Sequence, residues 1–302
     1  MKLFKILAFV LLTVTSFMAC NKNEEPELPK PTISDIEIGL NNNEIGVTGR
    51  DFHFNAEVLA GDKIDIVQIK IVQRSTETYS GAWGHEIIWE QYKGAKNATV
   101  HKHFDIPADA IEGKYDFLII VKDQNGTILE EKRILNIYKA ENLPVDPELS
   151  VFNITANGKF FYRNGKLSNP EITSLKKDDV TWIQATLGNI KGDGKMYIVY
   201  INKKLNHRPE TIDKIDMSKA MIYDVYEHSG WTQGDYFSNI VSGTRFAPDF
   251  IIGALQDNNV PIPNPVSGDK AWETGTYHVG VVYQNTTYNI SFYKYIEIDI
   301  EM

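Results

Sequence analysis

The chain has one cysteine, Cys20, among its 302 residues. A single thiol excludes an internal disulfide and any zinc site built from several cysteines. Lysine and arginine form no basic run, and the formal net charge is −9, so a nucleic-acid partner is not expected. Hydrophobic residues make up 42% and charged residues 24% of the chain, which is the balance of a folded globular protein.

Familiar catalytic patterns are missing as well. The sequence contains no G-x-S-x-G, no H-E-x-x-H, no P-loop and no dinucleotide-binding glycine pattern. Its carboxylates have no spacing that separates a glycosidase acid–base pair from ordinary surface charge. These absences favour a binding protein over an enzyme.

A marked apolar run, at residues 6–18, follows Lys2 and Lys5 and precedes Ala19-Cys20. It is shorter than the roughly 20 residues of a membrane span, and the arrangement is typical of a secretory signal peptide. A small residue before the lone cysteine resembles a bacterial lipobox, in which the chain is cleaved before the cysteine and the cysteine is acylated. We therefore expect a signal peptide at residues 1–19 and a lipid on Cys20 that anchors the protein to the outer membrane. Ordinary secretion with a chance cysteine is the alternative.

Residues 20–31 combine acidic residues with three prolines and have no apolar pattern, so they predict a disordered tether. Acidic residues close behind a lipidated cysteine resemble the surface-export signal of Bacteroidetes lipoproteins, which predicts exposure on the cell surface. Cleavage would leave 29 basic and 40 acidic residues, a net charge of −11. The lipid, rather than charge, would then hold the protein at the membrane.

From residue 33 onward, apolar and polar residues alternate with the period of β-strands. Phe52, Phe54 and Val58, for example, alternate with His53 and Glu57. Several such strands within about 110 residues predict an immunoglobulin-type sandwich. Later strands are predicted at residues 180–187, 196–201, 277–283 and 290–300, and a short helix is predicted at residues 218–225. The predicted fold class is all-β.

A polar segment with two prolines, residues 139–147, marks a domain boundary. We expect two immunoglobulin-like β-sandwich domains in tandem, at residues 32–139 and 147–302, the second with long loops. In each half a Gly-x-Tyr sequence opens a late strand, ending in Tyr115 and Tyr277. This resembles the tyrosine corner, in which a tyrosine hydroxyl bonds to nearby backbone, so both tyrosines are expected to be structural.

Histidines provide the candidate metal ligands. His101 and His103 form an H-x-H pair, whose side chains share one face of a strand. His53 lies opposite the apolar face of its own strand. In an immunoglobulin-type sandwich the two strands are neighbours, so the three imidazoles could bind a transition metal ion or haem. His85, in a presumed loop, is a candidate fourth ligand. The alternative is a set of solvated surface histidines.

Aromatic residues provide a second candidate site. Trp83 and Trp89 are predicted between two strands, and Trp231 and Tyr236 are predicted in a glycine-bearing loop. Exposed rings of this kind can stack on a sugar or a porphyrin. The alternative is that these rings fill the core.

Two stretches of the first domain, residues 31–71 and 92–126, resemble a Bacteroidetes lipoprotein family catalogued as domain of unknown function 4625. The resemblance covers residues 31–138 and includes His53, the pair His101 and His103, and the Gly-x-Tyr ending in Tyr115. Many members also have histidine just after that tyrosine, where this chain has Asp116 and Leu118. The resemblance implies an envelope lipoprotein with an immunoglobulin-like fold, and it implies no activity.

Three functions follow from these patterns. The first is capture of a transition metal ion or haem at the cell surface for an outer-membrane transporter. The second is glycan binding through the tryptophans, and the third is a structural or adhesion role without a small ligand. Converging histidines would favour the first, and exposed coplanar indole rings would favour the second.

Overall fold

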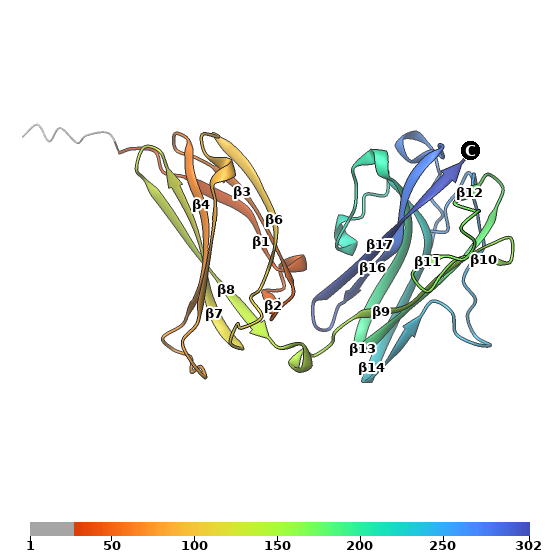
Figure 1. The fold of residues 1–302 in the computed structure, drawn as a ribbon, viewed down its shortest axis with the longest axis horizontal. Coiled ribbons are helices and arrows are strands. Elements are labelled where there is room, and N and C mark those ends of the chain that lie inside the picture. The colour runs from red at the N-terminus through yellow and green to blue at the C-terminus, as the bar shows by residue number, and fades with distance from the viewer. Residues whose placement is uncertain (1–26) are drawn as a thin grey trace, which may run out of the picture.

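The computed structural model describes residues 27–302 (Figure 1). The predicted signal peptide, Cys20 and most of the tether lie outside the described residues. Within residues 27–302 the helical elements are 3-10 turns of three residues, and the rest of the regular structure is strand. The predicted all-β class is confirmed. This part of the chain also contains no helix that is long and apolar enough to cross a membrane.

The N-terminal domain, residues 32–138, consists of two sheets. One sheet has the order β1 (Thr32–Ile38), β3 (Asp51–Leu59), β6 (Asn97–Asp105). The other has the order β2 (Ile45–Val47), β8 (Ile128–Tyr138), β7 (Gly113–Asp123), β4 (Ile64–Gln73), β5 (Gly84–Trp89). Strands β2 and β8 are parallel, and the other neighbours are antiparallel. The β-sandwich is therefore established, and the immunoglobulin type stays a prediction.

The alternation along β3 determines what lies on each face of its sheet. Phe52 and Phe54 are buried, and their rings lie 6.0 and 5.8 Å from the ring of Phe117 on the facing sheet. His53, between them, must point away from this core because successive strand residues face opposite sides. Strand β3 pairs with β6, with His53 opposite His103, so the predicted neighbourhood of these strands is confirmed.

The C-terminal domain, residues 148–301, is built on one branched sheet. Its path is β11 (Lys166–Leu167), β10 (Lys159–Arg163), β9 (Glu148–Ala156), β13 (Val180–Asn202), β16 (Gly275–Asn285), β17 (Ile290–Glu301), β12 (Ser174–Lys176). Strands β14 (Ala220–Ser238) and β15 (Phe250–Ile251) also pair with β13.

Strand β13 joins the two predicted strands at residues 180–187 and 196–201 into one long element. Its first part pairs with β9 and its last part with β16, and its register with β14 shifts between Leu187 and Gly194. A long strand with bulges can turn a sheet back on itself. Residues from both parts, such as Ile183 and Ile198, accordingly share one buried core. A smaller cluster that includes Val199, Ile215 and Ile222 covers the other face of the sheet.

The helix predicted at residues 218–225 is wrong, because β14 begins at Ala220. Met221 and Tyr223 belong to the main core, whereas Ile222 and Val225 belong to the smaller cluster. A strand covered on both faces reads as a continuous apolar run, which periodicity alone does not distinguish from a helix.

Both predicted tyrosine corners are present. The Tyr115 hydroxyl donates to the Ile111 carbonyl at 2.6 Å, and the Tyr277 hydroxyl donates to the Glu273 carbonyl at 2.9 Å. Both tyrosines are fully buried. Each hydroxyl therefore satisfies a backbone group where the chain enters a late strand, β7 or β16.

The end of the predicted tether is attached to the N-terminal domain. The Pro29 carbonyl accepts hydrogen bonds from the Asn125 side chain at 2.9 Å and from the Thr127 hydroxyl at 3.2 Å. A disordered tether up to residue 31 is therefore wrong at its last residues, because this carbonyl docks on the β7–β8 turn.

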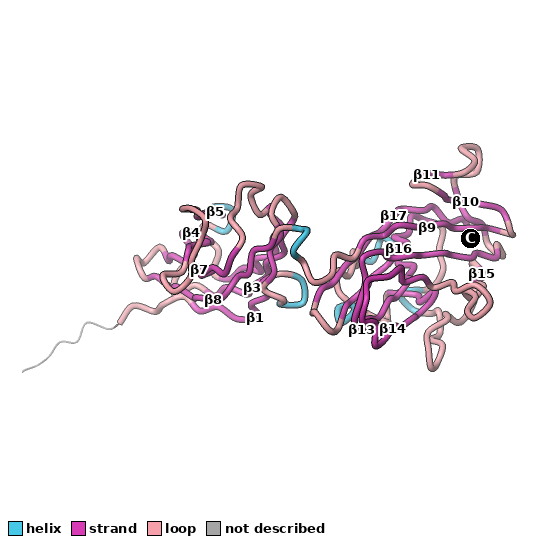
Figure 2. Tube along the Cα trace, turned by 90° about the horizontal axis from the view of Figure 1, so that it is seen from below, coloured by secondary structure: helices cyan, strands magenta, loops and turns pink. Residues whose placement is uncertain are grey.

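A short linker with one 3-10 turn, η4 (Ala140–Asn142), connects the two domains. Figure 2 shows the domains following one another along the length of the molecule, with this linker between them. Arg50 holds the linker to the N-terminal domain through two bonds to Asp146, at 2.6 and 2.8 Å.

Tyr277→Phe should lower the free energy of unfolding of the C-terminal domain by about 1–2 kcal/mol, because the buried Tyr277 hydroxyl both donates to the Glu273 carbonyl and accepts from the Glu273 backbone N–H. Urea denaturation followed by fluorescence measures the loss. Tyr236→Phe is the matched control, since Tyr236 is 68% exposed, and it should change stability by less than about 0.5 kcal/mol. Equal effects of the two changes would contradict a structural role for the Tyr277 hydroxyl.

Candidate metal centre

Three imidazoles meet on the face of the β3–β6 pair that points away from the core. The ring of His53 lies 5.0 Å from that of His101 and 5.1 Å from that of His103, and the two rings on β6 are 5.5 Å apart. The predicted placement of the three side chains on one face of adjacent strands is confirmed.

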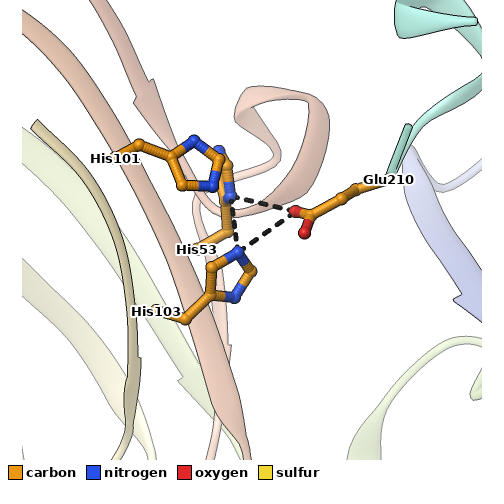
Figure 3. A group of neighbouring side chains, drawn as sticks. All are labelled: His53, His101, His103 and Glu210. Atoms are coloured by element: carbon orange, nitrogen blue, oxygen red, sulfur yellow. Dashed lines mark hydrogen bonds and ion pairs between the residues drawn. The ribbon is translucent and has the colours of Figure 1, made fainter. Parts of the chain in front are cut away.

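The expectation that all three side chains face outward to solvent holds for His101 and His103, which are exposed, and is wrong for His53, of which only 6% is exposed. The β13–β14 connection, residues 203–219, approaches from the C-terminal domain and brings Glu210 to the imidazoles (Figure 3). His53, His101, His103 and Glu210 each offer one ligand atom, and all of these atoms lie within 4.8 Å of one another.

Glu210 is held firmly by its own domain. The preceding residue, Pro209, accepts a hydrogen bond from the Tyr295 hydroxyl at 2.7 Å. Farther along the connection, Ile215 packs into the smaller apolar cluster. The His207 ring also accepts a bond from the Asp216 backbone N–H at 3.1 Å, which closes the connection into a compact loop. The position of Glu210 therefore follows that of the whole C-terminal domain.

Three ligand atoms form a nearly equilateral triangle. His53 Nδ1 lies 3.4 Å from His103 Nε2, and Glu210 Oε2 lies 3.3 Å from the first and 3.2 Å from the second. In a tetrahedral site with metal–ligand distances of about 2.0–2.1 Å, neighbouring ligand atoms lie about 3.3–3.4 Å apart. The triangle has the dimensions of one face of such a tetrahedron.

Two atoms in this group are buried without a hydrogen-bond partner among residues 27–302. They are Glu210 Oε2 and His53 Nε2. Buried polar atoms normally have partners, so a carboxylate oxygen without one that faces two imidazoles marks a candidate binding position.

Further carboxylates contact the outer nitrogens of the same rings. Asp51 Oδ2 lies 2.6 Å from His103 Nδ1, and Glu37 Oε2 lies 3.6 Å from His53 Nε2. An Asn41 backbone N–H donates to the other oxygen of Glu37 at 2.8 Å and fixes that carboxylate. A carboxylate at one ring nitrogen leaves the lone pair of the other nitrogen free, which is the usual arrangement around metal-binding histidines.

The electrostatics of the group follow from these contacts. Glu210 and Asp51 raise the pKa of His103 to about 9. Burial lowers the pKa of His53, but its contacts with Glu210 and Glu37 outweigh burial and raise it. Partial burial and the neighbouring His53 lower the pKa of His101. Burial raises the pKa of Glu210, but His103 and His53 outweigh burial and bring it well below the usual range.

Cavities flank the group where the two domains face each other. One, of about 340 Å³, is lined by Glu37, His101 and Lys214, among others. Another, of about 290 Å³, lies on the side of Asp51 and Tyr293. The group is therefore reachable by a small solute from the space between the domains.

His85, the candidate fourth ligand, does not join the group. It lies on β5, in the sheet across the core from β3 and β6, and its ring stacks near Trp83 at a centroid distance of 6.3 Å. The residue that completes the group is Glu210.

The aromatic candidates mostly fill cores. Trp89 stacks on the buried Phe54 ring at 5.7 Å, and Trp83 packs edge-on against Tyr115 at 5.2 Å. Trp231 lies 4.6 Å from the His228 ring, on β14 rather than in the predicted loop. Tyr236, also on β14, is exposed. The irregular register of β14 means that simple alternation does not predict the placement of Trp231 and Tyr236.

Sequence reasoning missed Asp51, Glu37 and Glu210. Asp51 carried a signal, because it lies two residues before His53 and therefore on the same strand face. Glu37 lies on β1, which the sequence did not place beside β3. Glu210 lies in a loop of the other domain, and its approach depends on how the domains dock.

Comparisons with known proteins identify the N-terminal domain. Residues 18–138 match the model of a family described as Domain of unknown function (DUF4625), so the predicted resemblance is confirmed. No match is found among curated proteins. Among solved structures, dimeric latent PorU from Porphyromonas gingivalis aligns at 11% identity over 93% of this chain and 21% of that chain, with a TM-score of 0.28. This chain spans about a fifth of the length of that structure, and a likeness of this size carries no argument about function.

The contacts of His103 predict a pH dependence. While Glu210 and Asp51 both contact the ring, a pKa that rises from 6.5 to about 9 on folding stabilises the protein below pH 6.5, and this stabilisation is lost as the pH rises through about 9. An NMR titration of chelator-treated protein should give a midpoint for His103 above 6.5, because Asp51 contacts the ring within the N-terminal domain itself, and Asp51→Asn should lower it. Asp109→Asn, on an exposed loop, should leave it unchanged. A wild-type midpoint near 6.5 would contradict the described contacts.

Proposed function

We propose that this protein binds one transition-metal ion, with Zn²⁺ as its simplest occupant, through His53, His101, His103 and Glu210. The observation that carries the proposal is the triangle formed by His53 Nδ1, His103 Nε2 and Glu210 Oε2, which has tetrahedral edge lengths. A modest rotation of the exposed His101 side chain supplies the fourth ligand. Imidazole and carboxylate ligands suit zinc and also copper, nickel and iron.

A simple network of ion pairs explains the geometry less well. Charge-assisted hydrogen bonds between nitrogen and oxygen are about 2.7–2.9 Å long. The two Glu210 separations are 3.2 and 3.3 Å, and Glu210 Oε2 receives no hydrogen bond within residues 27–302. The separations of the three atoms therefore match the edges of a tetrahedral metal site better than the lengths of direct charge-assisted hydrogen bonds. By contrast, Asp51 and His103 form a short bond of 2.6 Å outside the triangle.

A bare ion fits this group better than haem does. Haem iron takes protein ligands only along the axis of its ring, so it needs one or two donors and a flat slot. Here four donor atoms from four side chains lie within 4.8 Å of one another. Four protein ligands also leave a tetrahedral ion no open position for a substrate, which favours binding over catalysis.

The cellular role proposed for the site is metal capture at the cell surface. A lipid on Cys20 would anchor the protein to the outer membrane, and the bound ion would pass to an outer-membrane transporter. The packed tryptophans Trp83, Trp89 and Trp231 support this role over glycan binding, because each ring already packs against another aromatic ring of its own domain.

Titration calorimetry tests the site directly. The chelator-treated Cys20→Ser protein should bind one Zn²⁺ per chain at micromolar concentrations, and the double change His101→Ala with His103→Ala should abolish the binding heat. Binding should weaken as the pH falls from 9 to 5, because protons compete for the same nitrogens and His103 has a pKa of about 9.

His85→Ala is the matched control, since it removes an imidazole from the same domain but from the other sheet. It should bind Zn²⁺ like the wild type. Absence of Zn²⁺ binding by the wild type, or a loss of Zn²⁺ binding in His85→Ala equal to that in the double variant, would contradict the proposed site.

Anchoring has its own test. Intact-mass measurement of the protein purified from its native host should show that residues 1–19 are absent and that Cys20 carries acyl chains. An unmodified Cys20, or retention of residues 1–19, would contradict the proposed anchor.

A further inference from the structure

Resting on the proposed function, we infer that the metal ion fastens the two domains together, so that the site is a metal-dependent clamp on domain orientation. In the loaded protein the C-terminal domain is fixed against the face of β3 and β6. In the metal-free protein it is released to move on the linker.

The division of the ligands supports the clamp. His53, His101 and His103 belong to the N-terminal domain, whereas Glu210 belongs to the C-terminal domain (Figure 3). Glu210 cannot leave the group by a local loop movement without breaking the Tyr295–Pro209 bond and exposing Ile215. Loss of its contact with the metal therefore frees the whole domain.

No buried apolar core is shared across the remaining interface of the described residues. Each of the three clusters of buried apolar side chains within residues 27–302 lies inside one domain. Direct side-chain contacts across the boundary include a reciprocal pair between Asn41 and Asn289, at 2.6 and 3.2 Å, and a 3.9 Å ion pair between Lys214 and Glu37. Polar contacts of this kind contribute little to docking, because water replaces them readily.

The space between the two domains is incompletely packed, which also supports the clamp. The cavities of about 340 and 290 Å³ on either side of the metal group are lined by residues of both domains. A permanent interface would fill such space with close-packed side chains. Domains joined by small, polar interfaces generally move relative to each other.

Three carboxylates lie close to the imidazoles where the two domains meet, which also favours a bound cation. Glu37 and Asp51 face the site from the N-terminal domain, and Glu210 faces it from the C-terminal domain. Lys214 approaches only one of them, at 3.9 Å. A divalent ion between the three imidazoles and Glu210 would attract these carboxylates more strongly than singly charged side chains do.

The clamp links metal affinity to domain orientation in both directions. An ion that favours the docked orientation must be bound less tightly when the domains are pulled apart. A partner that binds the undocked orientation would thereby promote release of the ion. The docked and undocked forms would also let a partner distinguish loaded from empty protein.

Small-angle X-ray scattering tests the clamp on the Cys20→Ser chain with Zn²⁺ and with chelator. Zn²⁺ should reduce the radius of gyration and the maximum dimension of the wild type, and it should slow proteolysis of the linker near Leu143 by at least about tenfold. Glu210→Ala keeps the three imidazoles, so it should still bind Zn²⁺, but more weakly because one of the four ligands is lost. In this variant saturating Zn²⁺ should change neither the scattering nor the proteolysis.

Glu227→Ala is the matched control, because it removes an exposed glutamate of the same domain that pairs with Lys195. It should behave like the wild type. Zn²⁺ binding without any change in scattering or proteolysis would overturn the clamp and leave the metal site standing, as would an unchanged response in Glu210→Ala. Failure of the wild type to bind Zn²⁺ in calorimetry would overturn the metal site and the clamp together.

Discussion

The approach of Glu210 to the imidazoles of His53 and His103 is the contact on which the proposed function and the proposed domain movement both depend. It places a carboxylate from one domain at 3.2 and 3.3 Å from two ring nitrogens of the other. It also buries His53 and leaves a carboxylate oxygen without a hydrogen bond among the described residues. A metal ion at this point would coordinate that carboxylate oxygen and would at the same time link the two domains.

The N-terminal half of the site follows from local rules that a sequence displays. Strand alternation puts His53 opposite Phe52 and Phe54, and the i, i+2 spacing puts His101 and His103 on one face. Pairing of β3 with β6 then brings the three rings together, which the expected strand order anticipated. Asp51 follows from the same alternation, since it shares the face of His53.

The C-terminal half of the site does not follow from such rules. Glu210 reaches the imidazoles only because β17 and the β13–β14 connection pack as they do and because the whole domain docks on the β3–β6 face. How two folded domains dock on each other leaves no periodic pattern in the sequence, so it could not be predicted from the residues alone. The helix predicted at residues 218–225 is wrong for a related reason. The β13–β14 connection covers the second face of β14, so apolar residues occur on both faces and the alternation typical of a strand is missing.

The proposed function requires one ion between His53, His101, His103 and Glu210. A crystal of the Zn²⁺-loaded protein, measured on both sides of the zinc absorption edge, locates that ion. We expect one strong anomalous peak per chain, about 2.0–2.2 Å from a nitrogen of each imidazole and from an oxygen of Glu210. A peak elsewhere on the surface, or Glu210 hydrogen-bonded to the imidazoles with no peak between them, would contradict the proposed function.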